Sequence, residues 1–250
     1  MCIRDSHRTS YITIALVALN VIAFFFWQPT TITGDTERAE IEFIYENAMI
    51  PCEVMNLDQL SDALVTECGA IVEGPTDDRA YFPEKNILLS VFASLFLHGG
   101  IAHLVGNMWF LMIYGNNVED RLGHVPYLLF YLVGGVVASI GHILSDPNSV
   151  IPVIGASGAI AAVMGAYLVM FPRARVRTII FPIVWRTFPL FAWFVLAQWF
   201  VFQFFTDPEA GIAWIAHVVG FVFGVVVALV VNNVTRRRTP SPWPAGFGPD

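Results

Sequence analysis

The stretch GASGAIAAVMGAYLVMFP, residues 155–172, decides how this chain folds. From Ser157 to Phe171 it contains no charged residue, and Pro172 ends it because proline cannot continue a helix. A helix over Ser157–Phe171 is roughly 22 Å long at 1.5 Å per residue, whereas the hydrocarbon core of a bilayer is roughly 30 Å thick. The stretch therefore predicts a short transmembrane helix. With Pro172 at one membrane boundary, Ser157 lies several ångströms below the other.

The composition indicates that lipid is the solvent for most of the chain. Of the 250 residues, 56% are hydrophobic and 13% are charged, whereas a soluble domain has roughly 25% charged residues. The net charge of −7 arises mainly from acidic residues at positions 28–86. The sequence has no basic surface interleaved with aromatic residues. We therefore expect a lipid bilayer as a partner, and no nucleic acid.

Further apolar runs predict additional membrane helices. Crossing a bilayer takes roughly 17–25 residues, and five more runs meet this length: Tyr11–Trp27, Ile101–Val118, Val125–Leu144, Phe188–Phe205 and Ile212–Val231. Two shorter runs, Ile87–Leu97 and Val176–Trp185, are expected to lie at the interface or to dip into the membrane. The predicted fold class is therefore all-α, a polytopic membrane protein whose six-transmembrane-helix bundle covers residues 11–235.

The segments outside this bundle are a short N-terminus, residues 1–10, a long outer loop, residues 28–86, and a tail, residues 236–250. The tail is rich in Pro and Gly from Thr239 onward and is expected to be disordered. No small-residue cleavage site follows the first apolar run, so we expect no cleavable signal peptide.

The placement of Arg and Lys predicts the orientation of the helices, because loops on the cytoplasmic side are enriched in these residues. With the N-terminus inside, ten of the thirteen basic residues lie inside, namely Arg4, Arg8, Arg121, Arg173, Arg175, Arg177, Arg186 and Arg236–Arg238. Both termini are then cytoplasmic, and the second, fourth and sixth helices begin at the outer face. Cys52 and Cys68 lie in the outer loop, either as two unrelated thiols or, if that side is oxidising, as a disulfide.

Four polar side chains interrupt the apolar helices. His103 and Asn107 lie on the second helix, Ser157 begins the fourth, and His217 lies on the sixth. Any one of them alone is typical of helix packing. Counted from the outer face, however, Asn107, Ser157 and His217 lie at a similar depth, with His103 one turn above. Polar groups that meet inside a membrane indicate a functional site.

These residue types predict a serine hydrolase. A serine hydroxyl is a poor nucleophile until a base removes its proton, and His217 is the candidate base for Ser157. His103 and Asn107, spaced i and i+4, project from one helix face and are candidates to stabilise the oxyanion. No Asp or Glu lies within the second, fourth or sixth helix, so we expect a dyad without an acidic third member. Close approach of the fourth and sixth helices is predicted by the small residues Gly155, Gly158, Gly220 and Gly224.

The sequence resembles the rhomboid family of intramembrane serine proteases over roughly residues 86–232. The matching stretches are HGGIAHLVGNM at 98–108, GASG at 155–158, AHVVGF at 216–221 and YGNNVEDRLG at 114–123. The resemblance implies cleavage within or near a substrate's transmembrane helix close to the outer face, a water-accessible cavity, and no metal or cofactor. It matches Ser157 to the nucleophile, His217 to the base, and His103 and Asn107 to the oxyanion contributors. It also matches His98 to a further histidine near the site.

Two features qualify this resemblance. Many members carry an aromatic residue four positions after the serine, packed against the catalytic histidine, whereas this chain has Ala161, so another side chain must hold His217. The fifth helix is rich in Phe and Trp, which is typical of a lipid-facing surface. By resemblance it forms, with the loop Thr206–Gly211, a lateral gate through which substrate enters. Six helices without an added seventh suit a bacterial plasma membrane.

Three other functions fit parts of the same pattern. A catalytically inactive rhomboid-like protein that binds membrane clients typically lacks the serine or the histidine, and this chain has both. A transporter or channel could relay protons through His103 and His217, but the helices lack carboxylates and the chain lacks internal repeats. A zinc peptidase could use His98, His103 and His217, but the sequence has no HExxH pair.

Overall fold

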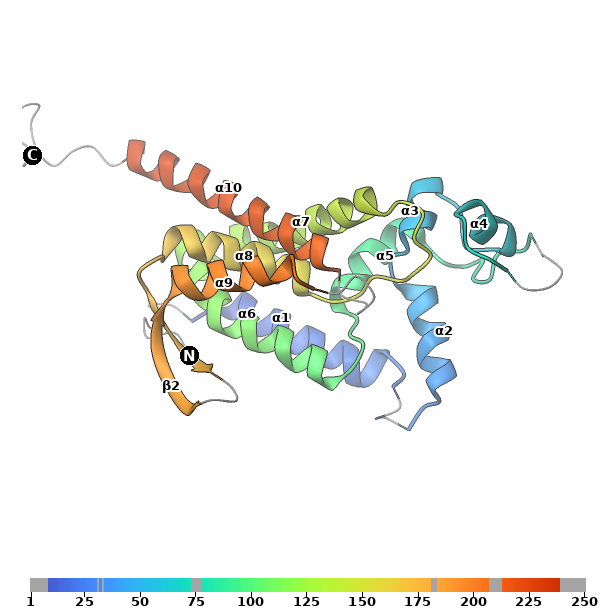
Figure 1. The fold of residues 1–250 in the computed structure, drawn as a ribbon, viewed down its shortest axis with the longest axis horizontal. Helices are drawn as coiled ribbons and strands as arrows, with labels where there is room; N and C mark the ends of the chain where they lie inside the picture. Colours follow the sequence, from blue (N-terminus) through green and yellow to red (C-terminus); the bar gives the residue numbers. More distant parts are fainter. Residues whose placement is uncertain are drawn as a thin grey trace, which may run out of the picture.

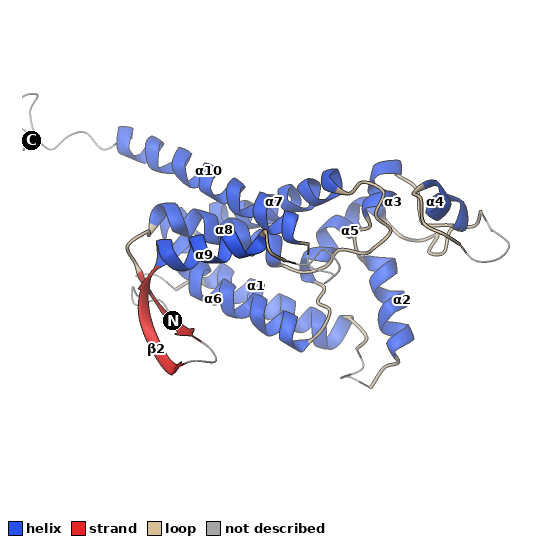
Figure 2. Ribbon diagram, in the orientation of Figure 1, coloured by secondary structure: helices blue, strands red, loops and turns tan. Residues whose placement is uncertain are grey.

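The computed structural model of the protein describes residues 9–30, 32, 34–72, 78–180, 184–206 and 213–238. Figures 1 and 2 show that most of them are helical. The helices are α1 (Tyr11–Ile22) with η1 (Ala23–Trp27), α2 (Glu37–Asn47), α3 (Pro51–Asn56), α4 (Asp62–Glu67), α5 (Ile87–Ala93) with η2 (Ser94–Phe96), α6 (Ile101–Leu122), α7 (His124–Ser145), α8 (Ser157–Met170), α9 (Ala192–Gln203) and α10 (Trp214–Arg238). The strands are β1 (Arg175–Ile180) and β2 (Val184–Phe191).

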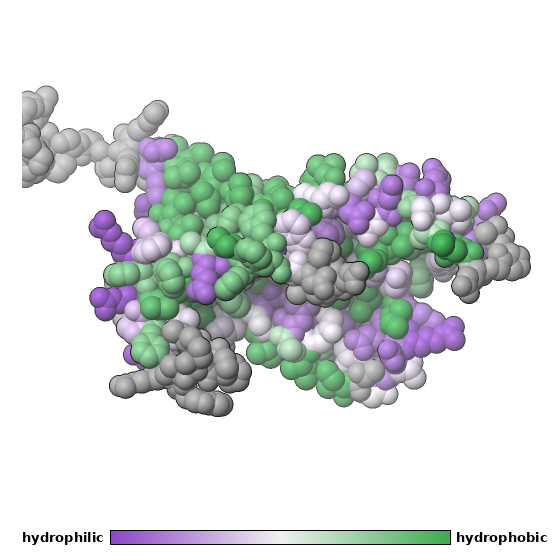
Figure 3. Space-filling model, viewed as in Figure 1, coloured by the Kyte–Doolittle hydropathy of each residue, from purple (hydrophilic) through white to green (hydrophobic). Residues whose placement is uncertain are grey.

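Within the described residues, two helices are long and apolar enough to cross a membrane, α7 over His124–Ser145 and α10 over Trp214–Val234. A third candidate is the pair of Ile87–Phe96 and Ile101–Leu122, which is bent by 79° at the break between them. The helices α1 with η1, α8 and α9 are apolar but shorter. In Figure 3 hydrophobic residues cover most of the surface over α8–α10, and hydrophilic residues gather over α2–α4 at one end and along the edge at the other.

The helix α8 lies at the centre of the bundle and packs against α6, α7, α9 and α10 (Figure 1). Its residues from Gly158 to Tyr167 are all buried, because neighbouring helices cover every side of it. Small residues make this close approach feasible. A Cβ at Gly134 of α7 would lie 2.8 Å from the Ala162 Cβ, and one at Gly224 of α10 would collide with the Ala162 carbonyl oxygen.

The β1–β2 hairpin departs from the all-α prediction. The run Val176–Trp185, which was expected to lie at the membrane interface or to dip into the membrane, contributes to an antiparallel pair in which Arg175 lies opposite Phe191. Val176–Ile180 is rich in β-branched residues, which favour extended backbone. Because Phe188–Phe191 belong to β2, α9 begins at Ala192 rather than at Phe188 as predicted.

The remaining predicted helix ends agree within a few residues, except that α10 continues beyond Val231 to Arg238. The end of a hydrophobic run therefore does not end the helix, since backbone hydrogen bonds do not require apolar side chains. The expectation of a disordered tail falls on residues 239–250, which lie outside the described part of the chain.

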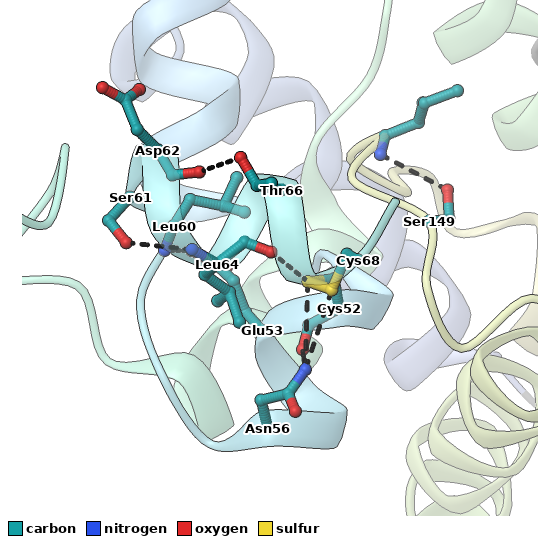
Figure 4. The surroundings of a disulfide bond; sticks show 11 residues. Cys52, Glu53, Asn56, Leu60, Ser61, Asp62, Leu64, Thr66, Cys68 and Ser149 are labelled. Carbon is teal, nitrogen blue, oxygen red and sulfur yellow. Dashed lines mark hydrogen bonds between the residues drawn. A yellow bond between two sulfur atoms is a disulfide. The ribbon is translucent and has the colours of Figure 1, made fainter. Parts of the chain in front are cut away.

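The outer loop forms a small folded unit of its own that contains α2, α3 and α4, and the sequence did not suggest these helices. Cys52 and Cys68 are joined by a disulfide (Figure 4). Glu53 and Lys85 form an ion pair of 2.5 Å with both side chains 1% exposed, and burial lowers the pKa of Lys85. The backbone N–H of Cys52 donates to the carbonyl of Ser149 at 3.0 Å, so the unit contacts the segment that precedes α8.

Candidate active site

Ser157 and His217 meet where the helices α8 and α10 begin. Ser157 is the first residue of α8, and His217 lies in the first turn of α10. The Ser157 Oγ lies 2.8 Å from the His217 Nε2, which is hydrogen-bonding distance. The free backbone N–H groups at the start of α8 and the positive end of its dipole also favour negative charge near the serine.

Glycines on facing helices permit this contact. A Cβ at Gly220, one turn after His217, would collide with the carbonyl oxygen of Gly158, which directly follows Ser157. A Cβ at Gly158 would lie 2.7 Å from the Ala138 Cβ on α7. The helices α8 and α10 therefore touch backbone to backbone beside the two polar side chains. Larger residues at these positions would separate them.

His103 and Asn107 face the same space from α6. Together with Ser157 and His217 they line a cavity of about 660 Å³. The Asn107 Nδ2 is buried and has no hydrogen-bond partner among the described residues, so it is a free donor at the cavity wall. Gly155 has a φ of +119°, and a Cβ there would lie 2.9 Å from the His103 ring. A glycine is thus required where the chain passes His103.

His98 lies behind His103 rather than in the cavity. It is 0% exposed, and its ring meets the His103 ring edge to face with centroids 5.1 Å apart. The side chain of Gln28 accepts a hydrogen bond from the His98 N–H at 3.1 Å and donates one to the His98 carbonyl at 2.7 Å. His98 therefore packs against His103 without lining the cavity.

The segment before Ser157 is held by Ser94 of η2 and by Met49 of the outer loop. The backbone N–H of Gly155 donates to the Ser94 carbonyl at 2.8 Å. The Ser94 hydroxyl accepts from the Met49 N–H at 2.6 Å, and the Met49 carbonyl accepts from the Val153 N–H at 2.8 Å. Three segments far apart in the sequence thus define the approach to the serine.

A further polar side chain, Gln203 of α9, also contacts the histidine. Its Oε1 lies 2.7 Å from the His217 Nδ1, and its Nε2 donates to the Trp199 carbonyl at 3.1 Å. Sequence reasoning missed Gln203, although a signal was present, since an amide within an apolar helix is costly unless it has a partner.

Comparisons with known proteins identify the family of this chain. The model of the Rhomboid domain family matches residues 85–233, more than half of the chain and nearly the range predicted from the motifs. The chain belongs to the rhomboid family. Its predicted membership is therefore confirmed, and this rhomboid is a predominantly helical membrane protein.

The similar curated proteins come from plants, animals, fungi and bacteria. RHOMBOID-like protein 6, mitochondrial, of Arabidopsis thaliana is 28% identical over 66% of this chain and 52% of its own length. Rhomboid protein 1, mitochondrial, of Saccharomyces cerevisiae is 25% identical over 60% of the chain and 44% of its own length. The Putative rhomboid protease YdcA of Bacillus subtilis is 36% identical over 30% of the chain and 38% of its own length. The chain thus spans about half the length, or less, of these relatives.

In this rhomboid an aromatic ring reaches the histidine from a different helix than the motif comparison suggested. Ala161 is 0% exposed within α8 and offers no ring. Trp199 of α9 lies with its ring centroid 5.9 Å from that of His217, and 5.9 Å from that of Phe221. Trp199 and Gln203, which both contact the His217 ring, therefore both come from α9.

The alternative zinc site finds no support in the described residues. No group of three or more His, Cys, Asp or Glu side chains that could hold a metal ion occurs there. His98 and His103 face each other, whereas His217 turns to Ser157 and Gln203.

Proposed function

We propose that this rhomboid is an intramembrane serine endopeptidase that cleaves transmembrane segments of membrane proteins near their outer ends. The observation that carries the proposal is the 2.8 Å contact between the Ser157 Oγ and the His217 Nε2 at the wall of a cavity. A hydroxyl and an imidazole in this arrangement are a nucleophile and its base. An inactive client-binding relative has no need of this contact.

The reaction begins when the Ser157 oxygen attacks the carbonyl carbon of a substrate peptide bond. The hydroxyl proton passes to the His217 Nε2 as the new C–O bond forms. His217 then gives this proton to the departing amine, which leaves an ester on Ser157. A water molecule, deprotonated by the same histidine, attacks the ester and releases the new carboxyl end. Each proton taken is returned, so the dyad is restored after every cycle.

The negative charge on the substrate oxygen requires nearby donors. The Asn107 Nδ2 is suited to this role because it is buried, unpaired among the described residues and on the cavity wall. His103 lines the same wall one turn away. Removing one such donor typically costs roughly 10²–10³-fold in kcat.

The proposed arrangement in the membrane has six crossings, by α1 with η1, α6, α7, α8, α9 and α10. The outer loop with its disulfide lies on the oxidising side, and the Arg-rich hairpin lies on the other side. Figure 1 supports this assignment, because α2–α4 and the hairpin occupy opposite ends of the molecule. Both termini are then cytoplasmic, and we assign the protein to a bacterial plasma membrane.

The proposed substrates are membrane proteins whose transmembrane helix unwinds near its outer end. An intact helix hides its peptide bonds, so small or helix-breaking residues near the cleavage point favour reaction. Entry from the lipid side past α9 is consistent with its exposed outer face, where Phe202 is 58% exposed.

The test is co-expression with a panel of tagged single-span membrane proteins. We expect cleavage of at least one by the wild type, none by Ser157→Ala or His217→Ala, and normal cleavage by Ser145→Ala, a serine at the exposed end of α7. A serine-directed fluorophosphonate probe provides a substrate-independent readout. Probe labelling that persists in Ser157→Ala, or that is absent from folded wild-type protein, contradicts the proposal and favours an inactive client-binding protein.

A further inference from the structure

Gln203 is the one buried polar residue on a helix that is otherwise largely exposed. The buried residues of α9 are Ala192, Leu196 and Gln203, and they lie on one face at helical spacing. An apolar side chain at position 203 would continue the buried face formed by Ala192 and Leu196 without the desolvation cost of an amide. The amide instead reaches His217 at 2.7 Å.

The orientation of the amide follows from its second hydrogen bond. The Gln203 Nε2 donates to the Trp199 carbonyl at 3.1 Å, so its Oε1 is the atom that faces the His217 Nδ1. A carbonyl oxygen only accepts hydrogen bonds, and the Nδ1 must therefore carry the proton. The Nε2 of a neutral imidazole is then unprotonated and can accept the proton of Ser157.

We propose that Gln203 is a positioning residue that keeps His217 in the tautomer required of the base. The proposal rests on the proposed function, because only a base that receives a proton at its Nε2 benefits from a fixed tautomer. Gln203 does not touch the reacting atoms. It acts through His217, in the place that a carboxylate occupies in other serine proteases.

A neutral amide suits this place because its surroundings are apolar. Trp199, Leu196 and Phe221 pack around the same part of α9 and α10. A carboxylate there would carry the cost of burying a charge away from water. The amide oxygen accepts the Nδ1–H and stabilises the imidazolium that forms during reaction through its dipole, without a resting charge.

The contact also couples α9 to catalysis. Both side chains that hold the imidazole, Gln203 by a hydrogen bond and Trp199 by ring packing, belong to α9. A displacement of α9 away from α10 therefore removes both supports at once. The base is fully oriented only when α9 is packed against the bundle, so a substrate that pushes α9 aside must allow it to return before the peptide bond is cut.

The experiment compares Gln203→Met, Gln203→Glu and a matched control, Gln198→Met, in full-length protein reconstituted in vesicles with a cleavable single-span substrate. Methionine keeps the volume of glutamine but removes the acceptor. Gln198 undergoes the same chemical change on the exposed face of the same helix. The readouts are kcat and KM separately, the pH dependence of kcat, the rate of labelling by a fluorophosphonate, and the thermal unfolding midpoint.

We expect Gln203→Met to lower kcat roughly 10- to 100-fold with little change in KM, because part of the imidazole population adopts the unproductive tautomer. The unfolding midpoint should equal that of Gln198→Met, whose kcat stays at the wild-type value. Gln203→Glu also accepts the Nδ1–H, so it should recover most of kcat. The acidic limb of its pH profile should move to higher pH, because a carboxylate stabilises the imidazolium.

Two results overturn the proposal. One is a kcat for Gln203→Met equal to that of Gln198→Met. The other is an equal loss in Gln203→Met and Gln203→Glu with no change in pH profile, which indicates packing alone. If Ser157→Ala is inactive in the same assay, either result removes the role of Gln203 and leaves the proposed function in place. If Ser157→Ala remains active, the proposed function itself fails.

Discussion

The substitution Gly220→Ala tests whether the backbone contact between α8 and α10 positions the two reacting side chains. The added methyl group would collide with the carbonyl oxygen of Gly158 and lie 3.2 Å from its carbon. Restoring an ordinary contact of roughly 3.5 Å requires the two helices to separate by about 1 Å at this level. Ser157 directly precedes Gly158, and His217 lies one turn before Gly220, so separating the helices here would also separate these two side chains. Their 2.8 Å contact would then lengthen beyond hydrogen-bonding range.

A displacement of about 1 Å can cost roughly 10²-fold in rate, so we expect kcat to fall by this order. Overpacking typically costs about 1–3 kcal/mol, so the protein should remain folded. The assays are substrate cleavage in vesicles and the rate of fluorophosphonate labelling, with thermal unfolding measured in parallel. Gly106→Ala is the control for unfolding, because a Cβ there has nothing within 4 Å. Wild-type cleavage and labelling by folded Gly220→Ala would refute the reasoning.

Three further predictions concern the outer loop and α9. Replacing Cys52 by Ala opens a disulfide whose cysteines are 16 residues apart. We expect the free energy of unfolding of the outer loop to fall by about 3 kcal/mol, so that proteases cut this loop earlier than in the wild type. Equal rates of proteolysis in the variant and the wild type would contradict this prediction. Lys85→Met leaves the Glu53 carboxylate buried without its partner and should lower the free energy of unfolding by about 3–5 kcal/mol. In chemical unfolding, the double variant that also carries Glu53→Met should regain most of this free energy. A double variant as unstable as Lys85→Met would argue against the ion pair. Trp199→Ala should slow cleavage because the Trp199 ring packs on the histidine. Phe202→Ala removes an exposed side chain and should leave kcat unchanged or raise it. Equal effects of the two substitutions on cleavage in the vesicle assay would count against a distinct role for Trp199.

The sequence predicted the helices of the bundle well, because burial in lipid requires long apolar runs whose ends are visible as charges and prolines. It also predicted Ser157 and His217 as a pair, since polar groups are rare enough in such runs to be compared by depth. It did not predict the strands β1 and β2 within the short run Val176–Trp185. Hydropathy does not distinguish an apolar strand from an apolar helix at that length.

The outer loop shows a second limit. Its helices α2–α4 have modest hydrophobicity, and their stability depends on the disulfide and on the buried pair Glu53–Lys85. Neither partner of an ion pair can be inferred from spacing alone, because the pairing depends on how the chain returns. The bridge between Met49 and Val153 could not be inferred from the sequence either, because about a hundred residues separate the two positions.

What the sequence determined by itself is the solvent of this chain, the order of its helices and the candidate residues for its proposed chemistry, since these follow from composition and from the cost of polar groups in lipid. Which side chain supports the histidine was decided only by the tertiary structure. Gln203 and Trp199 lie on a helix whose rotation and approach are fixed by packing against α8 and α10. That packing depends on where small residues on several helices coincide, and no single segment of sequence contains this information.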